Sequence, residues 1–354
     1  MSTTLKSSDA EYFNFINSLN APATKKLYTY CLEQFLQHYK LKDLRSFLIH
    51  EQKEQIIIQY LVEKKVSRQY KNDIFAALRH SCEISDIVLN WRKIKKFIRS
   101  SQKTGNEIAG KDRGYTHAEI QTILEFSDQR LKTAYLILAS TGMRIGGLIS
   151  LKVSDLERID DLYKVTVYSG EREQYITYTT PEAAKEIDAY LGFRKRRGER
   201  ITSDSHVIVK KFSYGGKSEP FKGYGLRSIL QDNILYNTGL REIGSKSKRK
   251  QIPVLHGFRK FFTKQLHNSE PKVDKAIIEF LLGHKIGLTG VYYKPTEQDM
   301  LNEYLKAVPL LTISNEERLK FKLEQRITIE RTQLEALRAD FDKFKKEVMS
   351  KKRK

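Results

Sequence analysis

"YKVTVYSGEREQYITYT", residues Tyr163 to Thr179, is the segment that decides the fold class of this chain. On both sides of a Gly-Glu break, β-branched and aromatic side chains alternate with other residues, which is the pattern of a two-stranded β-hairpin. Most of the remaining chain carries apolar residues at the three- and four-residue spacing of amphipathic helices. The sequence therefore predicts a mainly α-helical protein with a small β-hairpin or sheet, in the α+β class.

The helical pattern falls into two blocks separated by a polar stretch. Residues 1–101 predict a small all-helical domain, and the glycine-containing residues 102–115 have the composition of a linker. A second domain is expected over residues 116–312, because Thr116 and Glu119 form a capping-box pattern ahead of an apolar run. Its helices are expected at Leu131–Thr141, Pro181–Arg197, Tyr224–Asn237, Pro253–Asn268 and Pro271–Leu282.

Residues 313–354 have a third pattern. Apolar side chains step by three and four along the segment, charges lie between them, and the chain ends in a basic tail. The stepping residues are Leu334, Leu337, Phe341, Phe344 and Val348. The pattern predicts an amphipathic helix or short coiled coil, although Glu330 interrupts its seam. A helix docked on its own chain and an oligomerisation helix both fit.

The composition points to an anionic partner. The 354 residues carry a formal net charge of +21 and a pI of about 9.6, which favours nucleic acid over an anionic membrane surface. No apolar run approaches the roughly 18 to 20 residues of a membrane span, and the N-terminus lacks a signal-peptide pattern. We therefore expect a soluble, cytoplasmic protein associated with the nucleoid. Cys31 and Cys82 show no disulfide or zinc spacing and are expected to be buried thiols.

A dense basic run closes the first domain. It comprises Arg92, Lys93, Lys95, Lys96, Arg99 and Lys103. The run is either a DNA-binding surface or a solvated face of a basic protein. The chain's overall charge makes both interpretations reasonable.

Several polar residues in the second domain are ordinary when each is considered alone. Arg144 lies in a tight turn in "STGMRIGGLISL", residues 140–151. In "LHGFRKFF", residues 255–262, His256 and Arg259 share one face of an apolar helix. In "LLGHKIGLTGVYY", residues 281–293, His284 follows a glycine that can end a helix, and two tyrosines follow it.

The order and spacing of these three segments resemble the boxes of the tyrosine recombinase family, which includes phage integrases and the Cre-type and Xer-type recombinases. The resemblance covers the whole second domain, and the basic helical first domain is similar to the family's SAM-like core-binding domain. "YYKPTEQDMLNEYLKAVPLLTI", residues 292–313, further resembles archaeal integrases of viral or plasmid origin. The resemblance implies a two-domain clamp around duplex DNA, built from a core-binding and a catalytic domain.

The resemblance also implies a role for each residue of the site. Arg144 and Arg259 would hold the non-bridging oxygens of a phosphodiester with charge-assisted hydrogen bonds, and His284 would add a third donor. In the family the nucleophile follows this histidine by nine residues, which selects Tyr293, with Tyr292 as the runner-up. His256 would accept the tyrosine proton.

Two positions depart from the family pattern. Arg172 stands in the hairpin where the family usually has a lysine that protonates the leaving oxygen, and Lys164 on the preceding strand is the alternative donor. Gly147 stands where the first box normally has a glutamate that supports the first arginine. An arginine at 172 would act mainly by neutralising charge, because a guanidinium holds its proton tightly.

The implied activity is site-specific DNA recombination through a 3′-phosphotyrosyl intermediate, with no cofactor. The chain has no nucleotide-binding Gly-x-x-x-x-Gly-Lys loop and no carboxylate cluster at metal-binding spacing, and a zinc site formed by His256, His267 and His284 is disfavoured. The expected partners are double-stranded DNA attachment sites and, on paired sites, three further copies in a homotetramer. A type IB topoisomerase-like relaxase and a catalytically silent DNA-binding protein are the alternatives.

Overall fold

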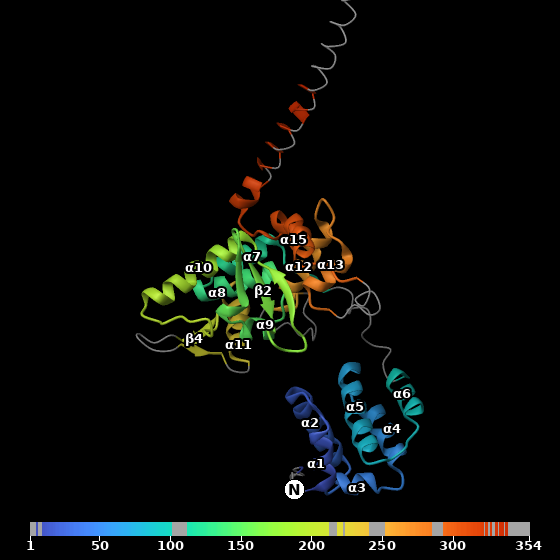
Figure 1. The fold of residues 1–354 in the computed structure, drawn as a ribbon. Helices are drawn as coiled ribbons and strands as arrows, with labels where there is room; N and C mark the ends of the chain where they lie inside the picture. Colours follow the sequence, from blue (N-terminus) through green and yellow to red (C-terminus); the bar gives the residue numbers. More distant parts are fainter. Residues whose placement is uncertain are drawn as a thin grey trace, which may run out of the picture. The chain divides into compact units, whose positions relative to one another are not determined.

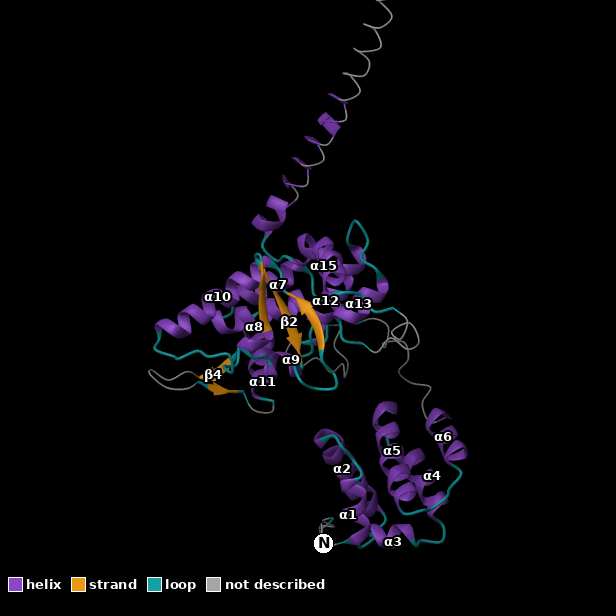
Figure 2. Cartoon of the chain, viewed as in Figure 1, coloured by secondary structure: helices purple, strands orange, loops and turns teal. Residues whose placement is uncertain are grey.

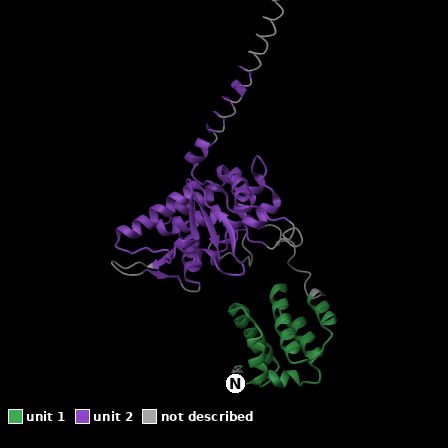
Figure 3. Cartoon of the chain, in the orientation of Figure 1, with its two compact units in different colours: residues 1–110 green, residues 111–354 purple. Residues whose placement is uncertain are grey.

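The structure, a computed structural model, describes residue 5 and residues 9–100, 112–211, 218–221, 224–240, 252–284 and 293–321, and positions between 323 and 338 with gaps. The chain divides into two compact units, Met1–Gly110 and Lys111–Lys354 (Figure 3). Both units are mostly helical, and the strands of the described residues all lie in the second (Figure 2). The predicted mainly helical class with small sheets is confirmed.

The first unit is a helical bundle in the part of it that the structure describes. Its helices are α1 (Ala10–Asn17), α2 (Pro22–His38), α3 (Leu44–Leu48), α4 (Lys53–Glu63), α5 (Arg68–Ile84) and α6 (Trp91–Ser100). Helix α2 packs on α5, and both α4 and α5 contact α6. The core contains Phe35, Tyr60 and Leu78, together with Cys31 and Cys82, which are buried free thiols as predicted.

The second unit is built around a three-stranded antiparallel sheet (Figure 1). Its strands are β1 (Leu156–Ile159), β2 (Leu162–Val167) and β3 (Tyr175–Tyr178), in the order β1-β2-β3. Strands β2 and β3 are the predicted hairpin. The sequence analysis missed β1, because four residues are too few to establish an alternating pattern. It also missed the short pair β4 (Val209–Lys211) and β5 (Glu219–Pro220).

Helices surround this sheet. They are α7 (His117–Glu125), α8 (Gln129–Thr141), α9 (Ile145–Ser150), α10 (Pro181–Arg196), α11 (Gly225–Asp232), α12 (His256–Asn268), α13 (Lys275–Leu281) and α15 (Glu297–Leu311), with the 3-10 turn η1 (Val153–Asp155) and the π-helical turn η2 (Asn233–Asn237). The predicted capping box of Thr116 and Glu119 opens α7. Helix α10 packs on β2 and α13 on β3, while α12 packs on α8 and α15. Phe258, Phe261 and Phe262 of α12 are fully buried in the core.

Two predicted helix starts are wrong. Helix α13 begins at Lys275 and not at Pro271, because the Asp274 side chain caps it by accepting hydrogen bonds from the backbone N–H groups of Ala276 and Ile277. Helix α12 begins at His256 and not at Pro253. The predicted helix over Tyr224–Asn237 is divided into α11 and the π-helical turn that follows it.

The chain after α15 returns to helical geometry. Residues 315–321 are helical, and helical positions recur among the described residues as far as 338. Leu319, Leu323 and Leu337 on this segment are exposed. The predicted seam residues Phe341, Phe344 and Val348 lie outside the described residues. Within the described part of the chain, no helix is both long enough and apolar enough to cross a bilayer.

Candidate active site

Arg144 is presented by a turn that requires glycine. Helix α8 ends at Gly142, whose φ of +62° lies in the left-handed region, and a Cβ atom there would lie 2.4 Å from Cδ1 of Phe262. Two residues later Arg144 occupies the N-cap position of α9 with extended backbone, makes no capping hydrogen bond with its side chain, and is exposed. The turn therefore fixes the backbone of Arg144 and leaves its guanidinium accessible to a ligand.

Arg259 lies behind this turn in the interior. It comes from the first turn of α12 and is only 5% exposed. Its Nη1 donates to the Gly142 carbonyl at 2.8 Å, and its Nη2 donates to the Leu282 carbonyl at 2.6 Å. One guanidinium thus joins the end of α8 to the end of α13.

His284 completes this group from the end of α13. Gly283, with φ of +64°, lets the chain pass Tyr175, because a Cβ atom at 283 would lie 2.4 Å from Cδ1 of Tyr175. The Nε2 atom of His284 lies 2.7 Å from Nη2 of Arg259, and its Nδ1 lies 2.5 Å from Oε2 of Glu279. A guanidinium can only donate, so Nε2 accepts, Nδ1–H donates to Glu279, and the imidazole is neutral in this arrangement.

The charge of Arg259 has no direct carboxylate partner among the described residues; its partners there are two carbonyls and a neutral imidazole. Burial and the nearby Arg144 lower the pKa of Arg259. A buried cation that lacks an anionic partner is costly. It is correspondingly well suited to bind an anion brought by a ligand.

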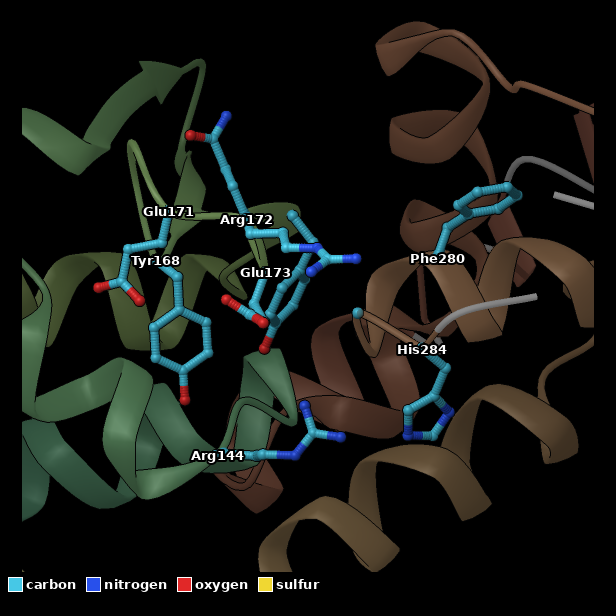
Figure 4. A pocket seen from close by; sticks show the side chains of 10 residues that line it. Arg144, Tyr168, Glu171, Arg172, Glu173, Phe280 and His284 are labelled. Carbon is cyan, nitrogen blue, oxygen red and sulfur yellow. The ribbon is translucent and has the colours of Figure 1, made fainter. Parts of the chain in front are cut away.

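A cavity of about 440 Å³ lies in front of Arg144 and His284, whereas Arg259 does not line it. Arg144, Arg172 and His284 reach it from the α9 N-terminus, the β2–β3 turn and the end of α13 (Figure 4). Tyr168, Tyr175 and Phe280 contribute aromatic walls, and Glu171, Glu173, Gln174 and Gly283 line the remainder. Guanidinium groups that converge in this way are chemically suited to bind an anion such as a phosphoryl group, although Glu171 and Glu173 share the lining with them.

Lys164, the alternative to Arg172, lies elsewhere. Its ammonium forms ion pairs with Glu157 and with Glu297, the latter at 2.8 Å, and these two carboxylates raise its pKa. Lys164 does not line the cavity, whereas Arg172 does. The arrangement therefore favours Arg172 as the hairpin cation of the site.

His256 and Tyr293 are not among the side chains that line the cavity. His256 is the first residue of α12. Its pKa is lowered, mainly by partial burial and to a smaller extent by the neighbouring cations Arg259 and Lys260. The Tyr293 ring packs against Phe280, with centroids 6.3 Å apart, and the residue is 40% exposed. Burial and the carboxylates of Asp274, Asp299 and Glu303 raise the pKa of Tyr293.

The structure thus brings Arg144, Arg172, Arg259 and His284 together and places Tyr293 beside a residue of the cavity wall. Tyr292, the runner-up, lies outside the described residues. His256, His267 and His284 form no metal-binding group. Among the described residues, no other cluster of three or more histidine, cysteine, aspartate or glutamate side chains could hold a metal ion.

Sequence reasoning missed three residues of this site. Glu279 accepts a hydrogen bond from His284 and could have been suspected from its place on α13, the helix that ends just before this histidine. Tyr168 and Tyr175 flank the hairpin turn, with ring centroids 6.4 Å apart. The buried Tyr175 hydroxyl lies near Arg259 without an aligned hydrogen bond; burial raises its pKa and Arg259 opposes that rise. In the sequence both tyrosines are ordinary strand residues.

The predicted basic run lies on α6. Arg92, Lys93, Lys95 and Lys96 are exposed on one side of the helix, while Ile94 and Ile98 are buried on the other. Lys93 forms an ion pair with Glu54 at 2.6 Å. The Arg99 side chain and Lys103 lie outside the described part of the chain.

Residues 114–299 match the sequence profile described as the Phage integrase family. The chain belongs to this family. It is accordingly a site-specific tyrosine recombinase, an enzyme that breaks and rejoins DNA strands. No curated protein matches the chain in sequence.

Two solved structures are similar in fold. The XerH site-specific recombinase bound to difH substrate, in a pre-cleavage complex, is 16% identical with a TM-score of 0.51, over 85% of this chain and 91% of that chain. The Tn1549 transposon integrase in complex with circular intermediate DNA is 17% identical with a TM-score of 0.51, over 84% of this chain and 97% of that chain.

Proposed function

We propose that this recombinase cleaves double-stranded DNA at attachment sites by attack of Tyr293 on the scissile phosphate, with Arg144, Arg172 and Arg259 holding that phosphate. In the structure both ring nitrogens of His284 are engaged, by Arg259 and by Glu279, and His284 would add its donor once Nε2 carries a proton and releases Arg259. The observation that carries the proposal is the buried Arg259 guanidinium, which has no direct carboxylate partner among the described residues and bonds His284, a residue of the cavity wall. A phosphodiester would supply the missing negative charge.

The chemistry follows from the side chains present. The Tyr293 oxygen forms a bond to phosphorus and the 5′ oxygen leaves, so the free energy of the phosphodiester is kept in a 3′-phosphotyrosyl bond. Arg144 and Arg259 stabilise the charge that gathers on the non-bridging oxygens. His256, whose lowered pKa keeps it neutral near pH 7, accepts the tyrosine proton. Arg172 neutralises the leaving oxygen, which takes its proton from water.

Tyr293 must approach the phosphate for this reaction. Its ring rests on Phe280, and Phe280 itself lines the cavity, so the tyrosine starts beside the wall of the site. Binding of DNA would draw the hydroxyl from solvent toward the phosphate. The step requires rearrangement of the segment that carries Tyr293 and leaves Arg259 in place.

The first unit would act as the core-binding domain, with residues 102–115 as the linker of a clamp around the duplex. The exposed cations of α6, with Arg99 and Lys103, would contact phosphates along the DNA. Such contacts release counterions, so affinity should fall steeply with salt. The net charge of +21 agrees with this mode of binding.

Assembly into a homotetramer on paired sites is a further part of the proposal. The apolar residues Leu319, Leu323 and Leu337 after α15 are exposed and so are not packed on their own chain. This observation favours the oligomerisation helix over the docked helix. The segment over 292–313 additionally supports an origin among archaeal viral or plasmid integrases, through the resemblance already described.

The test is a suicide DNA substrate that carries the attachment sequence from the ends of the encoding element and traps the covalent intermediate. Adduct formation should disappear in Tyr293→Phe, which lacks the attacking oxygen, and persist in Tyr292→Phe, the matched control. Denaturing gel electrophoresis of labelled DNA measures both. An adduct that survives Tyr293→Phe would refute the assignment of the nucleophile.

A further inference from the structure

The first turn of α9, which follows Arg144, contains two adjacent glycines whose side-chain space is already occupied. A Cβ atom at Gly146 would lie 2.9 Å from the Tyr168 hydroxyl oxygen. One at Gly147 would lie 2.5 Å from Cγ1 of Val167 and 3.7 Å from Cζ of Tyr168. Both distances are too short for a real Cβ atom, so a larger residue at either position would displace Tyr168 or Val167. The end of β2 is therefore packed directly on the backbone that presents Arg144.

Tyr168 holds an unusual conformation at this contact. Its φ of +56° lies in the left-handed region, where a bulky residue is rare and strained. From there its carbonyl accepts the Glu171 backbone N–H at 2.9 Å, which starts the hairpin turn. The ring points from the hairpin toward the segment that carries Arg144 (Figure 4). Strained residues of this kind persist where surrounding contacts hold them, often beside functional groups.

The Tyr168 hydroxyl is also electrostatically coupled to the same segment. Burial raises its pKa, while Arg144 and the Gly147 backbone act in the opposite direction by favouring the phenolate. The ring is half-buried and lines the cavity together with Arg144. Steric contact and charge therefore both connect Tyr168 to the Arg144 turn.

We propose that Tyr168 is a positioning residue for Arg144, and that its phenol replaces the support given elsewhere in the family by a glutamate at the place of Gly147. A glutamate at 147 is excluded here, because Val167 and Tyr168 fill the space into which its side chain would extend. The Tyr168 ring and the Val167 side chain occupy the space that side chains at 146 and 147 would need, so the two glycines and Tyr168 fit only together. The inference rests on the proposed role of Arg144 at the phosphate.

The experiment is a double-mutant cycle on single-turnover cleavage of the suicide substrate by the full chain. It uses wild type, Tyr168→Phe, Arg144→Lys and the double variant, with DNA affinity measured in parallel. Removing only the hydroxyl should slow cleavage about 5- to 10-fold and change DNA affinity less than about twofold, because one hydrogen-bonding group near a charge is lost. In the Arg144→Lys background the same change should slow cleavage less than about twofold.

Controls separate this effect from a general effect on the hairpin. Tyr163→Phe removes another hydroxyl from β2, one that donates to Asp188 at 2.5 Å and does not line the cavity, and it should leave the cleavage rate unchanged. Tyr168→Ala, which also empties the space over the glycines, should slow cleavage more than Tyr168→Phe. Thermal unfolding confirms that each variant is folded.

The possible outcomes separate the role of Tyr168 from the proposed role of Arg144 at the phosphate. Equal slowing by Tyr168→Phe in both backgrounds, or no slowing in wild type, would overturn the role of Tyr168 and leave the proposed function intact. Normal cleavage by Arg144→Lys and by Arg144→Ala would instead show that Arg144 is dispensable. That result would remove the proposed role of Arg144 and this inference together.

Discussion

Two buried arginines in the second unit have opposite surroundings. Arg194 of α10 is fully buried, and it donates to both oxygens of Glu199, at 2.8 and 2.6 Å, and to the carbonyls of His206 and Val207. Arg259 of α12 is buried almost as deeply and bonds two carbonyls and a neutral histidine. One guanidinium is neutralised by a carboxylate, and the other has no such partner among the described residues.

This difference separates a structural charge from a functional one. Burial acts to raise the pKa of Glu199, but hydrogen bonds from Arg194 and Ser218 outweigh it, and the net effect is a lowered pKa. The carboxylate therefore stays ionised, and both of its oxygens accept hydrogen bonds from Arg194. A buried ion pair of this kind is strongly destabilised when one partner is removed. Arg259 has no directly bonded carboxylate among the described residues, so a ligand that brings negative charge would find an uncompensated cation there.

The largest effect on activity is expected from Arg259→Met. Loss of this cation should slow single-turnover cleavage of the suicide substrate about 10²- to 10³-fold, the usual cost of removing one preorganised donor from an oxyanion site. Stability should fall by roughly 1 to 3 kcal/mol, because the Gly142 and Leu282 carbonyls lose their donors. Gel assays and urea unfolding measure the two quantities.

Arg194→Met is the matched control for that variant, because it removes a buried guanidinium from the same unit at a distance from the cavity. Where it remains folded it should cleave DNA at close to the wild-type rate. A defect in cleavage as deep as that of Arg259→Met would show that the two arginines do not differ in function, and the comparison would fail.

The largest effect on stability is expected from the same Arg194→Met change. It leaves the Glu199 carboxylate buried without a cation, so the free energy of unfolding should fall by about 3 to 5 kcal/mol. Urea unfolding of the full chain, followed by circular dichroism, measures it. Adding Glu199→Leu should recover part of this loss, and a double variant less stable than Arg194→Met alone would contradict the assignment.

The contrast between these arginines could not be predicted from sequence. Arg259 was predicted through its spacing from His256 on one helical face, and the helix and its apolar side were confirmed. Arg194 gave no signal, because its partner Glu199 follows the end of α10 and the carbonyls it bonds come from a loop further along. Motif order identifies residues that recur in a family, whereas pairing of buried charges depends on how distant segments meet.

The same limit applies to the rest of the site. The hairpin, the turn before Arg144 and the helix stop at Gly283 are local patterns, and sequence predicted each of them. The contacts of Tyr168 with Gly146 and of Lys164 with Glu297 depend on tertiary packing between segments about 20 and 130 residues apart. The resemblance already placed Arg172 ahead of Lys164 in the hairpin, but the ion pairs that hold Lys164 could not be predicted from sequence.

A second arginine–glutamate pair extends the comparison to the surface. Arg113 donates through Nη2 and Nη1 to both oxygens of Glu119, at 2.6 and 2.7 Å, and is bidentate like Arg194, which uses Nε and Nη2; the Arg113 side chain, however, is 43% exposed. Hydrogen bonds from Arg113, and next those from Thr116, lower the pKa of Glu119 from 4.5 to about 2, against an opposing effect of burial. Solvent screening and the capping box limit the expected effect of Glu119→Gln to about 1 to 2 kcal/mol at pH 7.

The sign of its pH dependence follows from that lowered pKa. The unfolded carboxyl takes up a proton near pH 4.5 and the folded one only near pH 2, so the stabilisation is complete above pH 4.5 and is lost as the pH falls toward 2. The stability difference between wild type and Glu119→Gln, measured by urea unfolding from pH 7 to 3, should therefore shrink below pH 4.5. Glu125→Gln, an exposed change at the other end of α7, should give a small difference at every pH. A Glu119→Gln difference that stays constant down to pH 3 would mean that its carboxylate is not held by Arg113, and that bidentate geometry at the surface contributes no measurable stability here.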